Sequence, residues 1–417
     1  MKIGVIGAGV AGLTATHILS KEHEVTLIEK NDRIGGHTNT INVEESGKKI
    51  GVDTGFIVLN DRNYPNFKKL LGNLKIDIRN TDMSFSYYDE NNGFNYAGTG
   101  ITGYFSQKKN LLSPKHYRFL LNVKKYSKIA TKDVENKNLL NETLGEYLIR
   151  KDFPQEIKDK FIIPMGAAVW SGSRKDILDF PVKMFLKFFD NHGILDLNNA
   201  PQWHTVIGGS YTYVKQILKE FNGTIIKGNG VTELKRNDTS VVLNLEKGEE
   251  LIFDKVVCAS HADQTYRMIK DLTKKETEIL KPWKYSKNIT ILHTDHTFMP
   301  PTKSAWACWN YVKNKDSNDV DDVSVTYYMN RLQGLKTSKD YFVTLNPGRS
   351  VPKDKTIFET TYTHPKYTQA AISTQENIAT VNGTNRIYFC GSYCRYGFHE
   401  DAVMSAVNVA KQLGCEL

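Results

Sequence analysis

The chain contains 417 residues, of which 40% are hydrophobic and 24% carry charge. This length exceeds what one ordinary hydrophobic core supports and predicts about two domains. No run approaches the roughly 18 consecutive apolar residues that span a bilayer, and the mean hydropathy of -0.43 is typical of a water-soluble surface. The net charge of +9 is compatible with nucleic acid, anionic lipid or acidic substrates, and bulk charge alone does not choose among them.

The N-terminus carries a dinucleotide-binding pattern. Residues Lys2–Ile6 predict a β-strand, which leads into Gly7-Ala8-Gly9-Val10-Ala11-Gly12 and then a helical stretch. In this pattern Gly7 permits a tight turn, Gly9 lets the backbone approach a pyrophosphate, and Gly12 lets helix and strand pack closely. The helix N-terminus then binds the phosphates. This spacing explains the apolar N-terminus better than a secretion signal does.

The ribose partner follows at the expected distance. Residues Glu24–Ile28 predict a second strand, and Glu29 at its end is placed to accept hydrogen bonds from an adenosine ribose. The same glycine pattern at residues 98–103 has no apolar strand before it, so we interpret it as a chance match. Because no second nucleotide domain is evident for NAD(P)H, the bound dinucleotide must do the chemistry itself, which favours FAD over NAD.

Residues 91–132 form a basic segment without any acidic residue. Apolar and aromatic side chains alternate with its charges, as in helices that lie on membranes. The alternative is a solvated helical face, and the sequence leaves both open. The charged residues are Lys108, Lys109, Lys115, Arg118, Lys124, Lys125, Lys128 and Lys132.

Five cysteines, an odd number, are scattered along the chain. This pattern argues against a disulfide framework and indicates a reducing compartment. Cys390 and Cys394 have no accompanying ligand pair, so we expect no metal site. We expect a cytoplasmic protein, with a peripheral position at the inner membrane face left open.

Two segments after the ribose acid, Arg33-Ile34-Gly35-Gly36-His37-Thr38 and Val52-Asp53-Thr54-Gly55-Phe56, extend the pattern. Together these elements resemble the FAD-dependent amine-oxidase superfamily, which includes monoamine oxidases, phytoene desaturases and protoporphyrinogen oxidase. The resemblance implies non-covalently bound FAD, because no cysteine lies in the expected attachment region about thirty residues before Cys390. His37 replaces the arginine of a Gly-Gly-Arg element. The implied cofactor contacts here are Gly35, Gly36, Thr54 and Gly55.

The resemblance returns near the C-terminus. Residues 386–391 are similar to the late strand that passes under the flavin, and residues 397–407 to the helix whose first amides face the isoalloxazine ring. Ser392 stands where the superfamily usually has an acidic residue that holds the ribityl chain. The implied contacts are Gly391, Ser392, Glu400, Asp401 and Ala402, and Val231 is a candidate backbone contact to the adenine.

A closer likeness spans essentially the whole chain. Several strings are similar to a bacterial family usually labelled predicted NAD/FAD-binding oxidoreductase. Members often accompany cyclopropane-fatty-acid-synthase-like methyltransferases, and some relatives are implicated in desaturating methylated acyl chains. The strings are Pro201-Gln202-Trp203, Gly208-Gly209-Ser210, His293-Thr294-Asp295, Trp309-Asn310-Tyr311, Thr344-Leu345-Asn346-Pro347 and Gly397-Phe398-His399-Glu400-Asp401.

The predicted fold is α/β, with a Rossmann-like FAD-binding domain of the amine-oxidase and glutathione-reductase type and a discontinuous α+β substrate domain. We expect the FAD domain in residues 1–60, 205–280 and 380–417. The substrate domain comprises a largely helical part at 61–204 and a strand-rich part at 281–379. Predicted strands in the latter include Asn288–His293, Val323–Met329 and Tyr341–Leu345.

Three residues are candidates for catalysis: His399, His192 and Tyr396. A flavin takes hydride from a substrate carbon, and the protein positions that carbon and handles a proton. In monoamine oxidases a strand lysine holds water against the flavin. Matching that strand to residues 286–292 places Asn288 at the lysine position and turns Lys287 to the opposite face.

Three function classes follow. The first is an oxidoreductase that desaturates or isomerises an unsaturated or methylated fatty acyl chain by hydride transfer to flavin. The second is an amine oxidase, and the third is a non-catalytic flavin-binding accessory to a lipid methyltransferase. We expect a lipid or other apolar small molecule as the substrate, possible contact with an anionic membrane, and no nucleic-acid partner.

Overall fold

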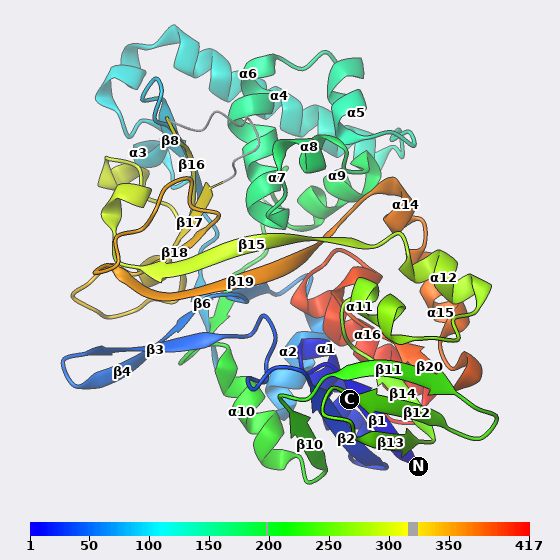
Figure 1. Ribbon diagram of the computed structural model, residues 1–417. Coiled ribbons are helices and arrows are strands. Elements are labelled where there is room, and N and C mark those ends of the chain that lie inside the picture. Colours follow the sequence, from blue (N-terminus) through cyan, green and yellow to red (C-terminus); the bar gives the residue numbers. More distant parts are fainter. Residues whose placement is uncertain (197–198, 316–323) are drawn as a thin grey trace.

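The computed structural model describes residues 1–196, 199–315 and 324–417. Figure 1 shows two stacked halves, with both chain termini in the lower one. The lower half is built on a parallel sheet, and the upper half combines a mixed sheet with a group of helices. This α/β arrangement agrees with the predicted fold class.

The lower sheet has five parallel strands in the order β10-β2-β1-β14-β20. Its central strands are almost wholly apolar because layers cover both faces. Helices α1, α10 and α16 cover one face, and a three-stranded antiparallel sheet covers the other. The strands are β1 (Lys2–Ile6), β2 (Glu24–Glu29), β10 (Thr224–Lys227), β14 (Lys255–Cys258) and β20 (Ile387–Phe389), and the helices are α1 (Val10–Leu19), α10 (Tyr211–Glu220) and α16 (His399–Gln412).

The covering sheet contains β11 (Val231–Arg236), β12 (Val241–Leu245) and β13 (Glu250–Phe253). Of these strands, β13 was not predicted from the sequence. An ideal Cβ at Gly4 would lie 2.9 Å from the Phe253 ring, so this glycine of β1 lets the covering sheet pack closely. Helices α11 (Ala262–Met268) and α12 (Lys274–Leu280) complete this layer.

The upper half contains a mixed sheet of seven strands in the order β19-β15-β18-β17-β16-β7-β8. Two of them, β7 and β8, come from the part predicted to be largely helical, because β7 pairs in parallel with a strand more than 200 residues later. Val323, the first residue of one predicted strand, lies outside the described residues. The strands are β7 (Phe85–Asp89), β8 (Asn95–Ala97), β15 (Lys284–His293), β16 (Trp309–Lys313), β17 (Ser324–Tyr328), β18 (Phe342–Leu345) and β19 (Thr356–Lys366).

Helices pack on one side of this sheet. The longest, α4, begins with Pro114 in its first turn and with Ser113 as its N-cap, whose hydroxyl accepts a hydrogen bond from the His116 amide. No described helix combines the length and apolar character that crossing a bilayer requires. The helices are α3 (Ile101–Tyr104), α4 (Pro114–Glu135), α5 (Leu144–Arg150), α6 (Gln155–Ile157), α7 (Ile163–Trp170), α8 (Arg174–Leu178) and α9 (Val182–Asn191).

Shorter elements connect the halves. Helix α15 follows β19 and packs against α12 of the lower half, although it begins within residues 281–379, which were predicted to belong to the substrate domain. These connecting elements are β3 (Thr40–Glu45), β4 (Lys48–Asp53), β5 (Val58–Asn60), α2 (Pro65–Asn73), β6 (Ile78–Thr81), β9 (Trp203–Val206), α13 (Met329–Leu332), α14 (Gln369–Ile372) and α15 (Ile378–Val381).

A buried carboxylate joins three of these segments. Asp53, at the end of β4, accepts hydrogen bonds from the Ser210 amide at 2.9 Å and from the Gln333 side-chain amide at 2.9 Å. Gln333 in turn accepts the Asp53 amide at 2.9 Å, and the Thr40 hydroxyl also donates to the carboxylate. Burial raises the pKa of Asp53 to about 7, despite these donors. The side chain thus ties the start of α10 to the end of α13.

Candidate functional site

A cavity of about 1550 Å³ runs between the two halves. Its lower end lies at the glycine loop before α1, and its upper end lies among α4, α7 and α9. Ordinary small-molecule pockets have volumes of roughly 300–1,000 Å³. The cavity therefore has room for a dinucleotide and a second molecule.

The lower end has the features of a pyrophosphate site. Gly7 has φ +99°, and an ideal Cβ at Gly12 would lie only 1.8 Å from the Gly7 carbonyl oxygen. At Gly9 the space is open, with no atom within 4 Å of the ideal Cβ. Helix α1 begins there without a side-chain cap, and Val10 and Ala11 line the cavity. Free helix amides beside open space fit the phosphates of a dinucleotide.

Glu29 lines the same end of the cavity and is 8% exposed. One carboxylate oxygen accepts the Ala8 amide at 2.9 Å, and the other accepts the Asn31 amide at 3.0 Å. The Asn31 side-chain amide also donates to this second oxygen at 2.8 Å. The oxygen that accepts the Ala8 amide therefore keeps a further lone pair, which can accept a ribose hydroxyl. Val231 also lines this end, next to Gly230.

Three neutral histidines lie where the cavity turns towards the upper half. His37 stacks on Tyr362 with a centroid distance of 4.9 Å, and its centroid lies 5.2 Å from that of His364 and 6.3 Å from that of His261. Burial lowers the pKa of His37 to about 4 and those of His261 and His364 to about 3. Nε2 of His37 is buried without a hydrogen-bond partner.

The unpartnered Nε2 of His37 can form a hydrogen bond with a bound cofactor. His37 stands where the superfamily has arginine, so the chain offers a neutral hydrogen-bonding group in place of a charge. Gly36, with φ +57°, lies so close to Gly9 that its ideal Cβ would be 3.0 Å from the Gly9 Cα. Thr54 and Gly55 also line the cavity here. These groups fit FAD.

Only some of the C-terminal residues that were predicted to contact the cofactor line the cavity. Gly391, Ser392, His399 and Ala402 line the large cavity, whereas Glu400 and Asp401 do not. Glu400 instead accepts the Phe67 amide at 2.9 Å and the Asn66 amide at 3.1 Å, which caps α2.

Asp401 caps its own helix, since it accepts the Phe398 amide at 2.9 Å. Gly12 and Gly35 also lie outside the lining residues, because they support the loop from within the fold. In total, four of the predicted cofactor contacts lie behind the cavity wall.

His192, one of the catalytic candidates, lines the upper part of the cavity. Its Nδ1 lies 2.9 Å from the Phe188 carbonyl oxygen, and its ring stacks on Phe188 at 3.8 Å. Because a carbonyl only accepts, Nδ1 carries the proton and Nε2 keeps a free lone pair. Burial lowers the pKa of His192 to about 4, so the ring is neutral at pH 7.

Of the other two candidates, His399 also lines the large cavity, whereas Tyr396 does not. His399 Nε2 lies 3.0 Å from the Thr38 hydroxyl and 3.2 Å from the Tyr213 hydroxyl, and its ring stacks on Phe56 at 3.6 Å. Burial holds the pKa of His399 well below its ordinary value. Tyr396 lines a smaller adjoining cavity of about 160 Å³.

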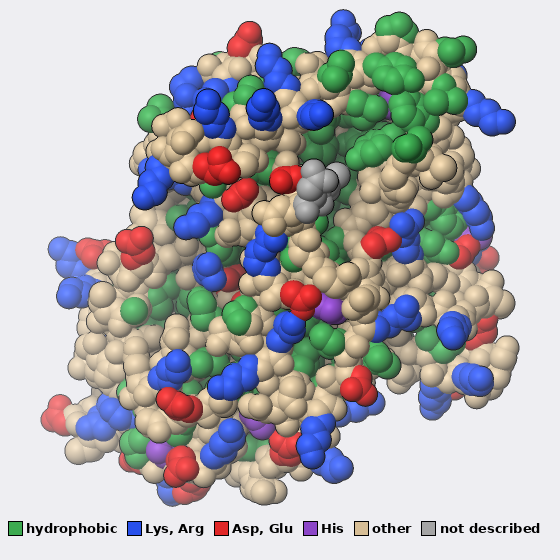
Figure 2. Space-filling view, turned by 180° about the vertical axis from the view of Figure 1, so that it is seen from behind, with side chains coloured by type: hydrophobic (Ala, Val, Ile, Leu, Met, Phe, Trp, Pro, Cys, Tyr) green, Lys and Arg blue, Asp and Glu red, His purple; other side chains and the backbone are tan. Residues whose placement is uncertain are grey.

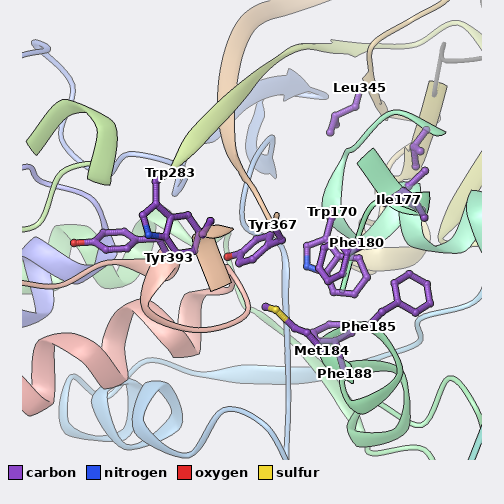
Figure 3. Close-up of a cluster of buried hydrophobic side chains, with 14 of the residues drawn as sticks. Trp170, Ile177, Phe180, Met184, Phe185, Phe188, Trp283, Leu345, Tyr367 and Tyr393 are labelled. Carbon is purple, nitrogen blue, oxygen red and sulfur yellow. The ribbon is translucent and has the colours of Figure 1, made fainter. Parts of the chain in front are cut away.

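The upper end of the cavity is lined mainly by aromatic and aliphatic side chains. Figure 3 shows part of the aromatic cluster behind it, where the Trp170 ring lies 4.4 Å from Phe180 and 4.9 Å from Phe188. Most of these lining residues could not be predicted from the sequence, because they come from separate elements and share no local pattern. The missed lining residues are Met83, Phe85, Tyr96, Phe119, Leu120, Val123, Phe161, Met165, Ile194, Leu195, Trp309, Tyr327 and Leu345.

Asn288 and Lys287 lie on opposite faces of β15, as the strand alternation predicts. Asn288 is 1% exposed, and its amide nitrogen lies 3.0 Å from Nδ1 of His364. Its oxygen accepts the Asn346 side chain at 2.8 Å. Lys287 is exposed, so no lysine takes the inward position on this strand.

Fold and site together define a two-domain, dinucleotide-binding flavoprotein enzyme. The chain belongs to the family described as flavin containing amine oxidoreductase, whose model matches residues 10–307. Within the described residues no group of three or more histidine, cysteine or acidic side chains could hold a metal ion.

Solved structures share the whole fold. A putrescine oxidase with bound putrescine has a TM-score of 0.71 at 12% identity, covering 99% of each chain. A fatty acid isomerase from P. acnes that produces CLA has a TM-score of 0.68 at 14% identity, covering 98% of each chain. At such identities the likeness shows the fold alone.

The curated relatives match only locally. The 4,4'-diapophytoene desaturase of Staphylococcus aureus is 57% identical over 42 residues, which are 10% of this chain and 8% of that protein.

The first prediction concerns the ribose carboxylate. Glu29→Ala should weaken FAD binding by about 1.5–3 kcal/mol, since charge-assisted hydrogen bonds to the ribose are lost. Titration of apoprotein with FAD measures this. Glu24→Ala, on the exposed start of the same strand, is the matched control and should bind as the wild type does. Equal affinities in all three proteins would show that Glu29 does not hold the ribose.

The second prediction concerns acid stability. Unfolded histidine takes up a proton near pH 6.5, whereas His261 resists protonation down to about pH 3. Between these values the unfolded state binds more protons, so acidification lowers the free energy of unfolding. Asp53 and Asp401 act in the opposite direction between pH 3.8 and about 7, because burial raises their pKa values.

The free energy of unfolding should therefore fall less steeply on acidification in His261→Phe. Between pH 6.5 and 4.5, the slope against pH should decrease by up to the equivalent of about one bound proton. Urea unfolding at several pH values measures the slope. An unchanged slope in His261→Phe would mean that this histidine is not held neutral.

Proposed function

We propose that this enzyme binds FAD non-covalently and desaturates or isomerises an unsaturated or methylated fatty acyl chain. The observation that carries the proposal is the apolar upper end of the cavity, which continues directly from the cofactor end. A long hydrocarbon gains about 0.8 kcal/mol for each methylene buried there. We also propose that the protein works in the cytoplasm.

One carboxylate that lines the upper end, Asp82, is already engaged by donors, which favours an apolar substrate over an ammonium ion at that position. Asp82 forms an ion pair with Arg331 at 2.6 Å and accepts the Ser84 hydroxyl at 2.8 Å. The Cys308 thiol also donates to it at 2.6 Å. A carboxylate that already accepts hydrogen bonds from three residues is a weak partner for a cationic amine.

Bound FAD would supply the chemistry by accepting hydride from a substrate carbon. The chain's part is to hold that carbon, exclude water and take the accompanying proton. The neutral His192 has a free Nε2 for that proton, and its place in the cavity wall brings it within reach of a bound chain. His399 fixes Thr38 and Tyr213 through its hydrogen bonds and supports the cofactor end.

An amine oxidase is the second candidate, and the family's description as flavin containing amine oxidoreductase favours it. Asn288 argues against it, because a buried amide cannot supply the charge of the strand lysine of monoamine oxidases. An accessory role beside a lipid methyltransferase would leave the flavin unreduced by any lipid.

The third prediction separates these candidates. Anaerobic mixing with phospholipids that carry methylated or unsaturated chains should bleach the flavin, whereas primary, secondary and polyamines should not. Stopped-flow absorbance follows the bleaching. For an isomerase, the same mixtures are examined for a shifted double bond. Bleaching by an amine alone would establish the amine oxidase, and neither bleaching nor a changed lipid would favour the accessory role.

His192→Gln tests the proton acceptor in the same assay. It should slow lipid conversion by a factor on the order of 10²–10⁴, which is typical for loss of a positioned base. The His23→Gln variant should react at the wild-type rate.

The fourth prediction concerns cofactor attachment. Denatured protein should release intact FAD into the supernatant, and chromatography of the released flavin identifies it. Flavin that stays with the precipitated chain would contradict non-covalent binding.

A further inference from the structure

We propose that the outer surface of α3, the short helix η1 (Lys108–Leu112) and the first half of α4 docks on an anionic lipid bilayer. We name this surface the docking face. It would bring the mouth of the cavity to the headgroup region. The proposal rests on the proposed function only for the acyl cargo, since the surface features stand without it.

The docking face concentrates exposed hydrophobic side chains. Leu112 is 89% exposed, Ile101 78% and Leu121 66%. Tyr117 and Leu111 are about half exposed. These are five of the thirteen large hydrophobics that are exposed among the described residues, within 21 consecutive positions. Figure 2 shows apolar side chains gathered at the upper right of that view, where α3 lies. Such a contiguous patch marks an interaction site.

Positive charge accompanies these anchors. Six exposed basic residues lie on the docking face: Lys108, Lys109, Lys115, Arg118, Lys124 and Lys125. No described residue forms an ion pair with any of them, whereas other lysines and arginines of the chain are often paired, as in Arg150 with Glu142. No acidic residue occurs from 91 to 132, so neighbours along the chain do not offset this charge. The surface is therefore complementary to anionic headgroups.

The cavity reaches the surface beside these residues. Leu120, Val123 and Ser127 of α4 line the cavity, and so do Thr99, which precedes α3, and Tyr104, its last residue. Because neighbouring positions of α4 point outward, one helix forms the cavity wall and carries the anchors. An acyl chain can thus pass from a bilayer into the cavity without crossing water.

Lys124 marks the boundary between the two environments. It is exposed and also lines the cavity. Its ammonium group can hold a phosphate or carboxylate at the mouth while the attached acyl chain lies inside.

A second copy of the chain fits this face less well. A twofold contact would place at least six positive charges opposite six more, and like charges across an interface are strongly unfavourable. A bilayer provides the opposite charge and an apolar interior for Leu112 and Ile101.

Co-sedimentation of the FAD-loaded protein with vesicles tests the proposal. Wild type should bind vesicles of phosphatidylcholine and phosphatidylglycerol, bind pure phosphatidylcholine poorly, and dissociate at high salt. Replacing Lys108, Lys109, Lys124 and Lys125 with glutamine should lower the partition coefficient by about 10²–10³-fold, since each basic residue contributes about fivefold. Leu112→Ser with Leu121→Ser should also lower it without changing the net charge.

The matched control replaces four exposed, unpaired lysines of the lower half, Lys21, Lys219, Lys247 and Lys275, with glutamine. This variant has the same net charge as the quadruple variant and should sediment like the wild type. Equal loss in both variants would show a bulk charge effect and overturn the proposal. So would a wild type that stays in the supernatant, or a dimer in solution that Leu112→Ser dissociates.

Flavin reduction by lipid in detergent separates this inference from the proposed function. Normal reduction without vesicle binding would overturn the docking face alone. Vesicle binding without lipid conversion would overturn the proposed function alone.

Discussion

The cavity depends on how the two halves are held together, and the buried carboxylate of Asp53 is central to that contact. It gathers donors from β3, from the start of α10 and from the residue after α13. Leaving a buried donor without its acceptor costs about 1–3 kcal/mol. The network therefore opposes sliding of one half over the other, and the space between the glycine loop and the upper helices keeps its shape.

The cofactor end could largely be predicted from the sequence, because its determinants are local. Gly7, Gly9 and Gly12 and the strands beside them lie within thirty residues, and backbone geometry leaves little freedom in their arrangement. Glu400 and Asp401 show the limit of this reasoning. At a helix start beside the flavin, a carboxylate can be a cofactor contact or an ordinary cap, and the sequence left both open. The structure shows that Glu400 caps α2 and that Asp401 caps α16.

The apolar end could not be predicted in the same way. Its lining combines β7, β16, α4, α7 and α9, so no sequence period reveals which of their buried side chains face the cavity. The parallel pairing of β7 with β16 is a long-range choice that propensity does not encode. The basic segment was visible in the sequence, whereas its position beside a cavity mouth was not.

Helix α4 has a consequence for how substrate reaches this enzyme. Its inner side chains line the cavity, while Leu121 and Lys125 face outward. A substrate that enters beside α4 would therefore come from the docking face. For a protein resting on a bilayer, supply is governed by the mole fraction of substrate in the leaflet and by lateral diffusion. The concentration of substrate per volume of solution then has little influence on the rate of supply. An apparent Michaelis constant would rise as inert lipid dilutes the substrate in two dimensions.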